Sequence, residues 1–152
     1  MATEIICGQL KSADLERLLA HYEQPEDLRI IMSCTGAEPD LMLAMAAAVC
    51  DYPGKVTIHA VGWCASAGVP VLACAEERIA HPWTQFLVHG ADKPHEAAGA
   101  WRNAWQAKLL GERTTQPSWF WMGLLMAGNK PRWFTAEEAL GWRLVHRIEE
   151  LR

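Results

Sequence analysis

The sequence has too little basic charge for a nucleic-acid-binding protein. Its 152 residues include 14 lysines and arginines against 18 acidic residues, which gives a formal net charge of −4. Binding to a phosphate backbone needs a basic face, and no cluster of basic residues supplies one. Long hydrophobic runs are also missing, because the apolar segments are shorter or more interrupted than the about 20 residues that cross a bilayer. We therefore expect neither nucleic acid nor a membrane as a partner.

Motifs that would indicate a cofactor or a secreted protein are absent as well. The five cysteines form no Cys-x-x-Cys pair and lie mostly in apolar segments, which predicts reduced, buried thiols instead of a disulfide framework. No His, Cys, Asp and Glu cluster has metal-ligand spacing, and no glycine-rich loop with a lysine is present to bind a nucleotide phosphate. The first residues, 1–4, lack the basic and apolar regions of a signal peptide. We expect a soluble cytoplasmic protein with no metal, no cofactor and no intrinsic ATPase activity.

The sequence does contain short apolar segments that alternate with helical patterns. Strands are predicted at 4–8, 28–33, 55–61, 78–80, 85–88 and 144–148, and helices at 12–21, 39–52, 69–75, 94–113, 118–126 and 135–142. Strands joined through helices by short turns indicate parallel crossovers and therefore an α/β sheet. Because no repeat or low-complexity linker interrupts the chain, we expect residues 1–152 to form a single domain. The helical region at about 93–128 is expected to project from it as an appendage.

Ser66 has the sequence surroundings of a nucleophile. It lies among small residues in a loop predicted at 62–68, which joins a strand to an apolar helix. A serine on such a tight turn projects its hydroxyl, and the amide of the next residue, Ala67, faces the carbonyl under attack. Taken alone the pattern has low specificity, because small residues before an apolar helix more often serve packing.

Two further segments favour the same chemistry. Residues 33–37 end a predicted strand at the edge where α/β sheets place their sites, and their free amides could complete an oxyanion hole. The alternative interpretation of this segment is a plain glycine turn. His89 follows an apolar strand, from which it can reach into a cleft as a general base. A single histidine at such a place is, however, more often a structural hydrogen-bonding residue.

Together these segments resemble the proteolytic subunit of the Clp protease, ClpP, and its phage-type relatives. Residues 62–68, Gly-x-x-Ala-Ser-Ala-Gly, resemble the nucleophile segment Gly-x-Ala-Ala-Ser-Met-Gly of that family, and residues 88–89 resemble its Ile-His. Residues 78–82 occupy the place of its Arg-x-x-x-Pro, residues 33–37 resemble its Ser-Pro-Gly-Gly segment, and residues 134–145 resemble its closing helix and strand. The order is the same and covers almost the whole chain. The five segments together are typical of the ClpP/crotonase superfamily.

The resemblance implies a fold and an activity. The fold would consist of repeated β-β-α units in a spiral, with the long helix as a projecting handle. The activity would be that of a serine endopeptidase that cleaves peptides or unfolded protein through an acyl-enzyme, with Ser66 as nucleophile and His89 as general base. The backbone amides of Gly36 and Ala67 would bind the oxyanion.

The resemblance also implies a homo-oligomeric ring, in which handle helices join two rings face to face. Four tryptophans, at 101, 105, 119 and 121, are candidates for that interface. For Trp119 and Trp121, packing inside the chain's own core is an equal alternative. In the family an N-terminal extension forms axial loops at the ring entrance, whereas this chain begins almost directly at its first strand. That departure argues against docking to an unfoldase ATPase.

The position of the family's triad acid departs from the pattern. Alignment through residues 135–139 puts Pro131 there, and proline cannot accept a hydrogen bond from an imidazole. Loss of the orienting acid in a serine triad can cost about 10⁴ in turnover, so the third role needs another group. Asn129 and Asp92 are the candidates. A dyad without a third side chain is the other interpretation.

Two alternative functions fit the same residues. Pro131 favours a catalytically impaired ClpP-like ring subunit with a scaffold or regulatory role, whereas the presence of Ser66 and His89 argues against it. Residues 73–80 also resemble a segment of the crotonase-like acyl-CoA enzymes. Those enzymes are considerably longer and have no need of a serine and a histidine at these two places.

Overall fold

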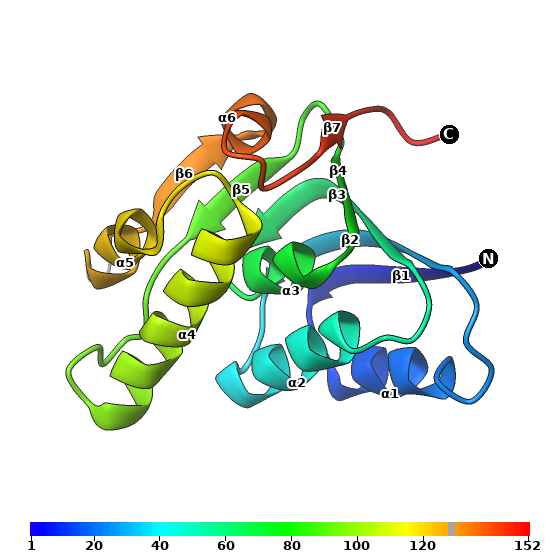
Figure 1. Cartoon of the computed structure of the whole chain (residues 1–152), viewed down its shortest axis with the longest axis horizontal. Coiled ribbons are helices and arrows are strands. Elements are labelled where there is room, and N and C mark those ends of the chain that lie inside the picture. Colours follow the sequence, from blue (N-terminus) through cyan, green and yellow to red (C-terminus); the bar gives the residue numbers. More distant parts are fainter. Residues whose placement is uncertain (128–129) are drawn as a thin grey trace.

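A twisted sheet, covered by helices on one face, forms the centre of the molecule (Figure 1). The computed structural model describes residues 1–127 and 130–152. Within them the strands are β1 (Ala2–Gln9), β2 (Leu28–Gly36), β3 (Val56–Ala65), β4 (Glu77–Ala80), β5 (Gln85–Val88), β6 (Arg132–Thr135) and β7 (Arg147–Ile148). The helices are α1 (Ser12–Ala20), α2 (Pro39–Cys50), α3 (Gly68–Cys74), α4 (Ala97–Arg113), α5 (Ser118–Met126) and α6 (Ala136–Gly141). Strands β1, β2, β3, β4 and β7 pair in that order, all in parallel, which confirms the predicted α/β class.

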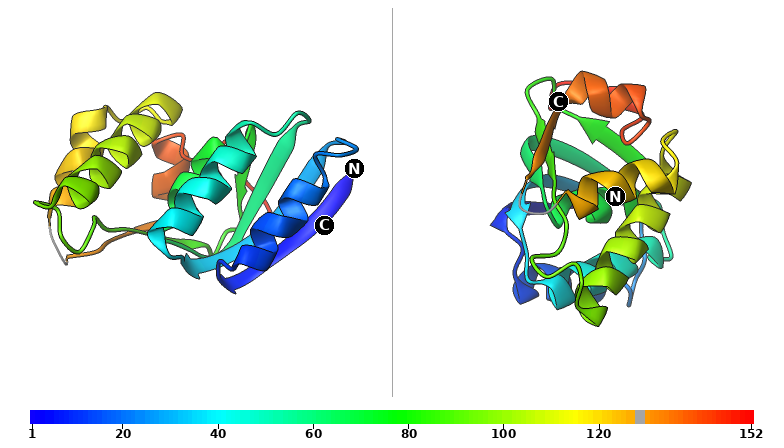
Figure 2. Two further views of the ribbon diagram at one scale, coloured as in Figure 1. Left: turned by 90° about the horizontal axis from the view of Figure 1, so that it is seen from below. Right: turned by 90° about the vertical axis from the view of Figure 1, so that its left-hand side faces the viewer.

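Helices α1, α2 and α3 lie side by side on one face of the sheet (Figures 1 and 2). Their buried side chains meet the inward residues of β2 and β3, where alternate positions such as Ile30, Met32 and Ile58 are almost fully buried. This burial is the main source of stability in the centre of the molecule. It also fixes the ends of β2 and β3, from which the candidate site is built.

Strand β3 changes its partner half-way along its length. Residues 57–60 pair with β4, and residues 63–65 pair with β5. In between, β3 bulges relative to β2, and Gly62 lies in the bulge with a φ of +69°, a left-handed conformation that favours glycine. The predicted loop at 62–68 is therefore wrong for residues 62–65, because the strand continues past the bulge up to Ser66.

The sequence pattern does not predict β6, which runs antiparallel to β5. This strand has four residues and begins directly after Pro131, and Arg132 and Trp133 are exposed, so it lacks a clear alternating pattern. Its pairing stacks Phe134 on Phe86 with ring centroids 5.2 Å apart. The last strand, β7, covers only residues 147–148 of the predicted 144–148. Residues 144 and 145 instead form a buried turn after α6, in which their amides donate to the Ala139 carbonyl.

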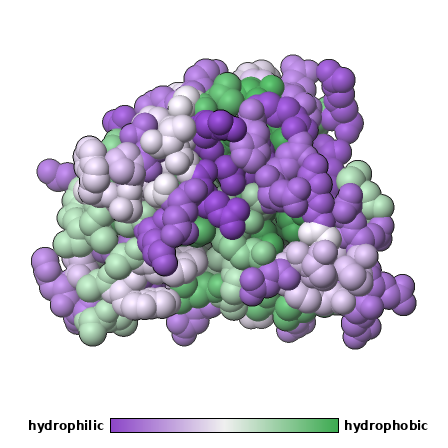
Figure 3. All heavy atoms as spheres, in the orientation of Figure 1, coloured by the Kyte–Doolittle hydropathy of each residue, from purple (hydrophilic) through white to green (hydrophobic). Residues whose placement is uncertain are grey.

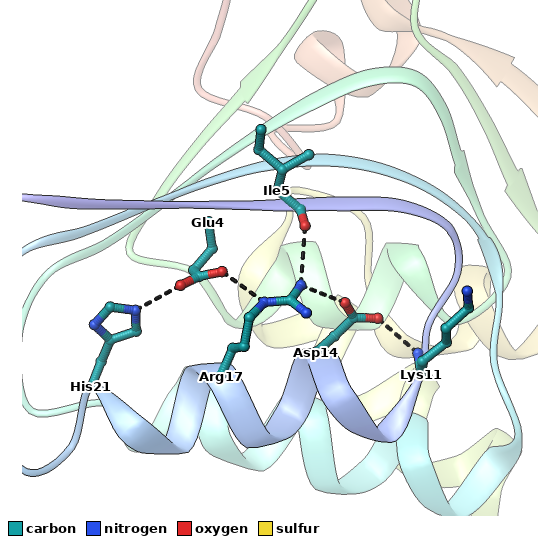
Figure 4. Close-up of polar contacts among 6 residues, drawn as sticks. All are labelled: Glu4, Ile5, Lys11, Asp14, Arg17 and His21. Atoms are coloured by element: carbon teal, nitrogen blue, oxygen red, sulfur yellow. Dashed lines mark hydrogen bonds and ion pairs between the residues drawn. The ribbon is translucent and has the colours of Figure 1, made fainter.

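Figure 4 shows how α1 is fastened to the edge strand β1. The Arg17 guanidinium donates to the carboxylates of Glu4 and Asp14 and to the Ile5 carbonyl, and His21 contacts the second Glu4 oxygen at 2.9 Å. Partial burial opposes ionisation of Glu4, but the hydrogen bonds from His21 and Arg17 lower its pKa overall. By occupying a backbone acceptor of an edge strand, Arg17 reduces the tendency of β1 to pair with another chain.

Helices α4 and α5 pack against each other at one end of the molecule (Figure 2). Trp121 is fully buried between them and the sheet, and its Nε1 donates to Thr114 Oγ1 at 3.0 Å, so this residue takes the core alternative and not the interface role. Trp119 and Trp101 are 75% and 56% exposed. No helix in the described ranges is long and apolar enough to cross a membrane.

Candidate active site

Ser66 stands at the tip of β3, immediately before α3. Its backbone φ is +54°, which for a residue other than glycine costs about 1–2 kcal/mol. The Ser66 N–H donates to the Leu87 carbonyl of β5 at 2.8 Å, and this bond holds the turn in place. Strained backbone of this kind is found where a side chain must be aimed, as at the nucleophile of a hydrolase.

His89 follows β5 and lies within hydrogen-bonding distance of Ser66. The distance between Ser66 Oγ and His89 Nε2 is 2.7 Å. The other ring nitrogen, Nδ1, lies 2.8 Å from the carbonyl oxygen of Gly90. Because a carbonyl oxygen only accepts, Nδ1 carries the ring proton and donates it, which leaves Nε2 to accept from the Ser66 hydroxyl. The neutral tautomer set by this pair of bonds is the one that a general base requires.

The Gly90 carbonyl is held in place by tight packing against α5. A Cβ atom on Gly90 would lie 1.8 Å from the Leu125 carbonyl oxygen, so this position has no room for a side chain. The backbone at residue 90 is therefore fixed by the contact between the end of β5 and α5.

The structure places the predicted candidates for the third role as follows. Asp92 is exposed and lines a hollow beside the site. The partner of His89 Nδ1 is the Gly90 carbonyl and not the Asp92 carboxylate. Asn129 lies outside the described residues. Pro131 is exposed and directly precedes β6. The backbone contact of Gly90 is the feature that sequence reasoning missed, because a main-chain carbonyl leaves no signature in the residue types.

Gly36 and Ala67, the predicted oxyanion residues, flank Ser66. Gly36 has a φ of +147°, which favours glycine, and a Cβ there would stand 4.0 Å from Ser66 Oγ, so residue 36 lies directly beside the hydroxyl. Ala67 is buried at the start of α3. A Cβ on the following Gly68 would come within 3.0 Å of Cys34 Cβ, which shows how closely α3 is pressed onto β2. Main-chain amides at such a turn are suited to hold a developing oxyanion.

Two hollows meet at Ser66 and His89. The larger, of about 510 Å³, is bordered by α2, the segment after His89 and α4, and the charged residues on its walls are Glu38, Asp92, Lys93, Glu96 and Arg102. The smaller, of about 330 Å³, is bordered by Thr35, Trp63, Ala65, Leu87 and Trp133. The Ser66–His89 pair is thus reachable from two sides.

Trp63 and Trp133 form an aromatic wall of the smaller hollow. Their rings meet edge to face with centroids 5.5 Å apart, and each side chain is 47% exposed. Sequence reasoning missed this pair, because Trp133 lies on the strand that the pattern does not predict. Exposed indole rings of this kind offer contact area for an apolar side chain of a ligand.

The site offers no place for a metal ion in the described part of the chain, residues 1–127 and 130–152, where no group of three or more His, Cys, Asp and Glu side chains is arranged to hold one. Cys34 and Cys64 lie behind the site, and burial raises the pKa of both thiols. A thiol with a raised pKa is a poor nucleophile near neutral pH. The Ser66 hydroxyl, which contacts His89, is therefore the better candidate for a nucleophile at this site.

Comparison with known proteins gives matches among solved structures. No family model and no curated protein matches the sequence. ClpP1 from Listeria monocytogenes superposes with a TM-score of 0.85 at 23% identity, over 99% of this chain and 92% of that chain. An Asn-to-Asp mutant of that ClpP1 gives a TM-score of 0.86 at 21% identity over the same shares. A peptidase from Plasmodium falciparum gives 0.81 at 11% identity, over 98% of this chain and 95% of that chain.

These likenesses show that the chain has the fold of ClpP, as the sequence resemblance predicts. The phage-type relationship stays a prediction. At this level of identity, activity has to be argued from the site itself.

Proposed function

We propose that the chain is a ClpP-like serine peptidase that hydrolyses peptides or unfolded protein through Ser66 and His89. The observation that carries this proposal is the 2.7 Å contact between Ser66 Oγ and His89 Nε2, made by a serine in left-handed backbone at a strand-to-helix turn. The ClpP fold of the chain supports the same reaction class.

In the proposed reaction, the Ser66 oxygen attacks a peptide carbonyl while its proton passes to His89 Nε2. The charge on the carbonyl oxygen is held by the amides of Gly36 and Ala67. His89 then gives the proton to the leaving amine, and the C–N bond breaks to leave an ester on Ser66. A water molecule, deprotonated by His89, hydrolyses that ester and restores the free serine.

The Gly90 carbonyl supports this cycle by holding the Nδ1 proton of His89 at 2.8 Å. It keeps the correct tautomer, whose loss in a serine triad costs about 10⁴ in turnover. A neutral carbonyl stabilises the imidazolium less than a carboxylate does, because it carries only a partial charge. We therefore expect turnover below that of a peptidase with an acid in this place.

The lining of the smaller hollow favours a substrate with a bulky apolar side chain next to the cleaved bond. Trp63 and Trp133 lie beside Ser66 and expose about half of each side chain. The larger hollow on the other side of Ser66 carries charged residues on its walls and leaves room for the rest of an extended chain. We expect a substrate in extended conformation to contact both hollows at once.

The face around α4 supports assembly into a homo-oligomer. Figure 3 shows pale green, mildly hydrophobic residues at the lower left of the molecule, where Figure 1 draws α4. The exposed residues there include several alanines and Trp101, and Trp119 on α5 is exposed nearby. Exposed apolar surface of this kind is typical of subunit contacts, and stacking of rings through α4 and α5 is the arrangement we propose.

A second candidate, an impaired ring subunit, is favoured by one observation: His89 Nδ1 is bonded to a neutral carbonyl and not to an acid. In that case the chain would act only as part of an assembly, and Ser66 would not hydrolyse a substrate.

Hydrolysis of an internally quenched peptide with leucine at its centre separates these candidates. The assembled chain is expected to cleave it, and Ser66→Ala and His89→Ala to lose at least about 10³ of the turnover. Cys7→Ser, a change at an exposed position of β1 away from both the site and the α4–α5 surface, serves as a control that keeps the chemistry. Cleavage that persists in Ser66→Ala contradicts the peptidase proposal, and a folded oligomer with no cleavage at all favours the impaired subunit.

A further inference from the structure

Asn103 is a fully buried polar residue on α4, and its side chain contacts the segment that follows His89. Its oxygen, Oδ1, accepts a hydrogen bond from the Ala91 N–H at 2.9 Å. Its nitrogen, Nδ2, donates to Met126 Sδ of α5 at 3.7 Å. Because the Ala91 N–H can only donate, the side-chain atom that faces it is the oxygen, and both ends of the buried amide therefore have a partner.

The N–H group that Asn103 binds belongs to the peptide unit that orients His89. The Gly90 carbonyl and the Ala91 N–H are the two polar groups of one planar peptide unit. At one end of this unit the Gly90 oxygen lies 2.8 Å from His89 Nδ1, and at the other end the Ala91 N–H donates to Asn103. With the 2.7 Å contact between His89 Nε2 and Ser66 Oγ, the hydrogen bonds form an unbroken series from Asn103 to Ser66.

Close backbone packing keeps the start of α4 on the segment that follows His89. A Cβ on Gly99, one turn before Asn103, would lie 2.0 Å from the Lys93 carbonyl oxygen and 3.3 Å from Ala91 Cβ. Position 99 therefore has no room for a side chain, and the two backbones touch there. Because of this contact, Asn103 has a fixed position relative to the Ala91 N–H.

We propose that Asn103 is a positioning residue for the Ser66–His89 pair, an inference that rests on the proposed peptidase function. By binding the Ala91 N–H, Asn103 sets the direction of the Gly90 carbonyl, and that carbonyl keeps the ring proton of His89 on Nδ1. The hydrogen bond to Asn103 also polarises the peptide unit, which strengthens the Gly90 oxygen as an acceptor. The buried amide thus supplies, through one peptide unit, part of the orienting role that an acid has in a triad.

Loss of the Asn103 oxygen would leave the Ala91 N–H without its partner. The peptide unit is then expected to rotate towards another acceptor, because an unpaired N–H is costly, and this rotation turns the Gly90 carbonyl away from His89. A misplacement of about 1 Å in a catalytic site can cost about 10² in rate. Asn103 lines neither of the two hollows, so we expect the loss to fall on kcat and not on KM.

The first test is hydrolysis of the quenched peptide by Asn103→Leu, which keeps the size of the side chain but has no acceptor. We expect kcat to fall by about 10² while KM changes by less than about threefold. Asn103→Asp, which has an acceptor oxygen in the same place, is expected to keep kcat within about tenfold of the unmodified chain. Asn103→Ala replaces the leucine variant if that variant does not fold, with a loss of kcat in the same direction.

Leu110→Val is the matched control for a disturbance of α4. Leu110 is fully buried on the same helix and lines neither hollow. The change is expected to lower the Tm, because it removes a buried methylene group, and to keep kcat within about threefold. A loss of stability in α4 is in this way separated from the loss of the hydrogen bond to Ala91.

A double-mutant comparison shows whether Asn103 acts through His89. The rate at which a fluorophosphonate probe labels Ser66 is measured for Asn103→Leu, for His89→Ala and for the variant with both changes. Asn103→Leu is expected to slow labelling when His89 is present and to have no further effect when His89 is already alanine, because the two residues act in one series of hydrogen bonds. A general disturbance of the site would slow labelling in both backgrounds.

Three results would overturn the inference while the peptidase proposal stands, provided that Ser66→Ala is inactive. They are a folded Asn103→Leu with unchanged kcat, an Asn103→Asp as impaired as Asn103→Leu, and an equal effect of Asn103→Leu with and without His89. If the unmodified chain neither cleaves the peptide nor reacts with the probe, the peptidase proposal itself fails, and the inference fails with it.

Discussion

His89 is oriented from one side by the Ser66 hydroxyl, at 2.7 Å, and from the other by the carbonyl of its own neighbour, Gly90, at 2.8 Å. Both bonds point to one tautomer, with the proton on Nδ1. In the proposed peptidase the backbone supplies the orienting half of a triad's third role, without the charge of an acid. Position 131, which the sequence resemblance to ClpP aligns with that acid, is an exposed proline.

If the Gly90 carbonyl orients His89, neither predicted side chain is needed for that role. Asp92→Asn and Asn129→Ala are each expected to keep peptide turnover within about threefold of the unmodified chain, whereas removal of an orienting acid costs about 10⁴. Steady-state kinetics with the quenched peptide measure this, and the Tm of each variant shows that it is folded. A hundredfold loss of kcat in either folded variant would assign the third role to that side chain instead.

At the residue scale, the sequence reveals functional side chains more readily than functional main-chain groups. Ser66 and His89 are visible because a serine among small residues and a histidine after an apolar strand are both recognisable types, and the structure brings them together. The Gly90 contact has no such signal, because any residue supplies a carbonyl. The position of the Gly90 carbonyl depends on the contact of Gly90 with Leu125 of α5, which lies 35 residues further along the chain.

At the scale of elements, the contact between the end of β5 and α5 sets the position of residue 90. A Cβ on Gly90 would lie 1.8 Å from the carbonyl oxygen of Leu125 on α5. A Cβ on Gly123, which lies on α5 itself, would meet nothing within 4 Å. The two glycines therefore make a matched pair, one at a close backbone contact and one on an exposed helix surface.

Substitution by alanine should affect these glycines with opposite signs. Gly90→Ala is expected to lower the free energy of unfolding by about 3 kcal/mol, because α5 must move away from β5. Gly123→Ala is expected to raise it by about 0.5–1 kcal/mol through helix propensity alone. Urea unfolding of both variants measures the difference. Equal effects, or a neutral Gly90→Ala, would show that residue 90 is not held by α5.

The elements that the sequence predicts well are those marked by a local signal, either a helical pattern or an apolar segment bounded by turn residues. The paired strands β1 and β2 and helices α1, α2, α4 and α5 all appear near their predicted ranges. The pattern fails at β6 and at the second half of β3, where pairing with a distant strand decides the conformation. The side chains of Thr135 and Glu138 form a capping box at the start of α6, which is a signal local to the sequence.

At the scale of the whole molecule, an ion-pair network joins the edge of β3 to β4 and β7. Glu77 on β4 accepts from Lys55, which precedes β3, at 2.6 Å, and it also pairs with Arg147 on β7. Hydrogen bonds from these two cations lower the pKa of Glu77 to about 2. Its side chain is 21% exposed, so solvent screens part of this interaction.

This network makes stability depend on pH in a defined window. A carboxylate with a lowered native pKa stabilises the fold above its unfolded pKa of 4.5 and loses that contribution as the pH falls towards about 2. Glu77→Gln is expected to be about 2 kcal/mol less stable than the unmodified chain at pH 7, with the difference shrinking below pH 4.5. Unfolding curves from pH 7 to pH 3 measure it, with Glu76→Gln as the exposed control. A difference that stays constant across this range contradicts the assignment.

If Ser66 is an activated nucleophile on a ClpP fold, a fluorophosphonate probe will react with it, and intact-mass analysis will detect the product. We predict one adduct per chain on the assembled protein, no adduct on Ser66→Ala, and labelling of His89→Ala slowed by at least about 10². Absence of an adduct on the folded, assembled chain, or an adduct that persists in Ser66→Ala, would contradict it.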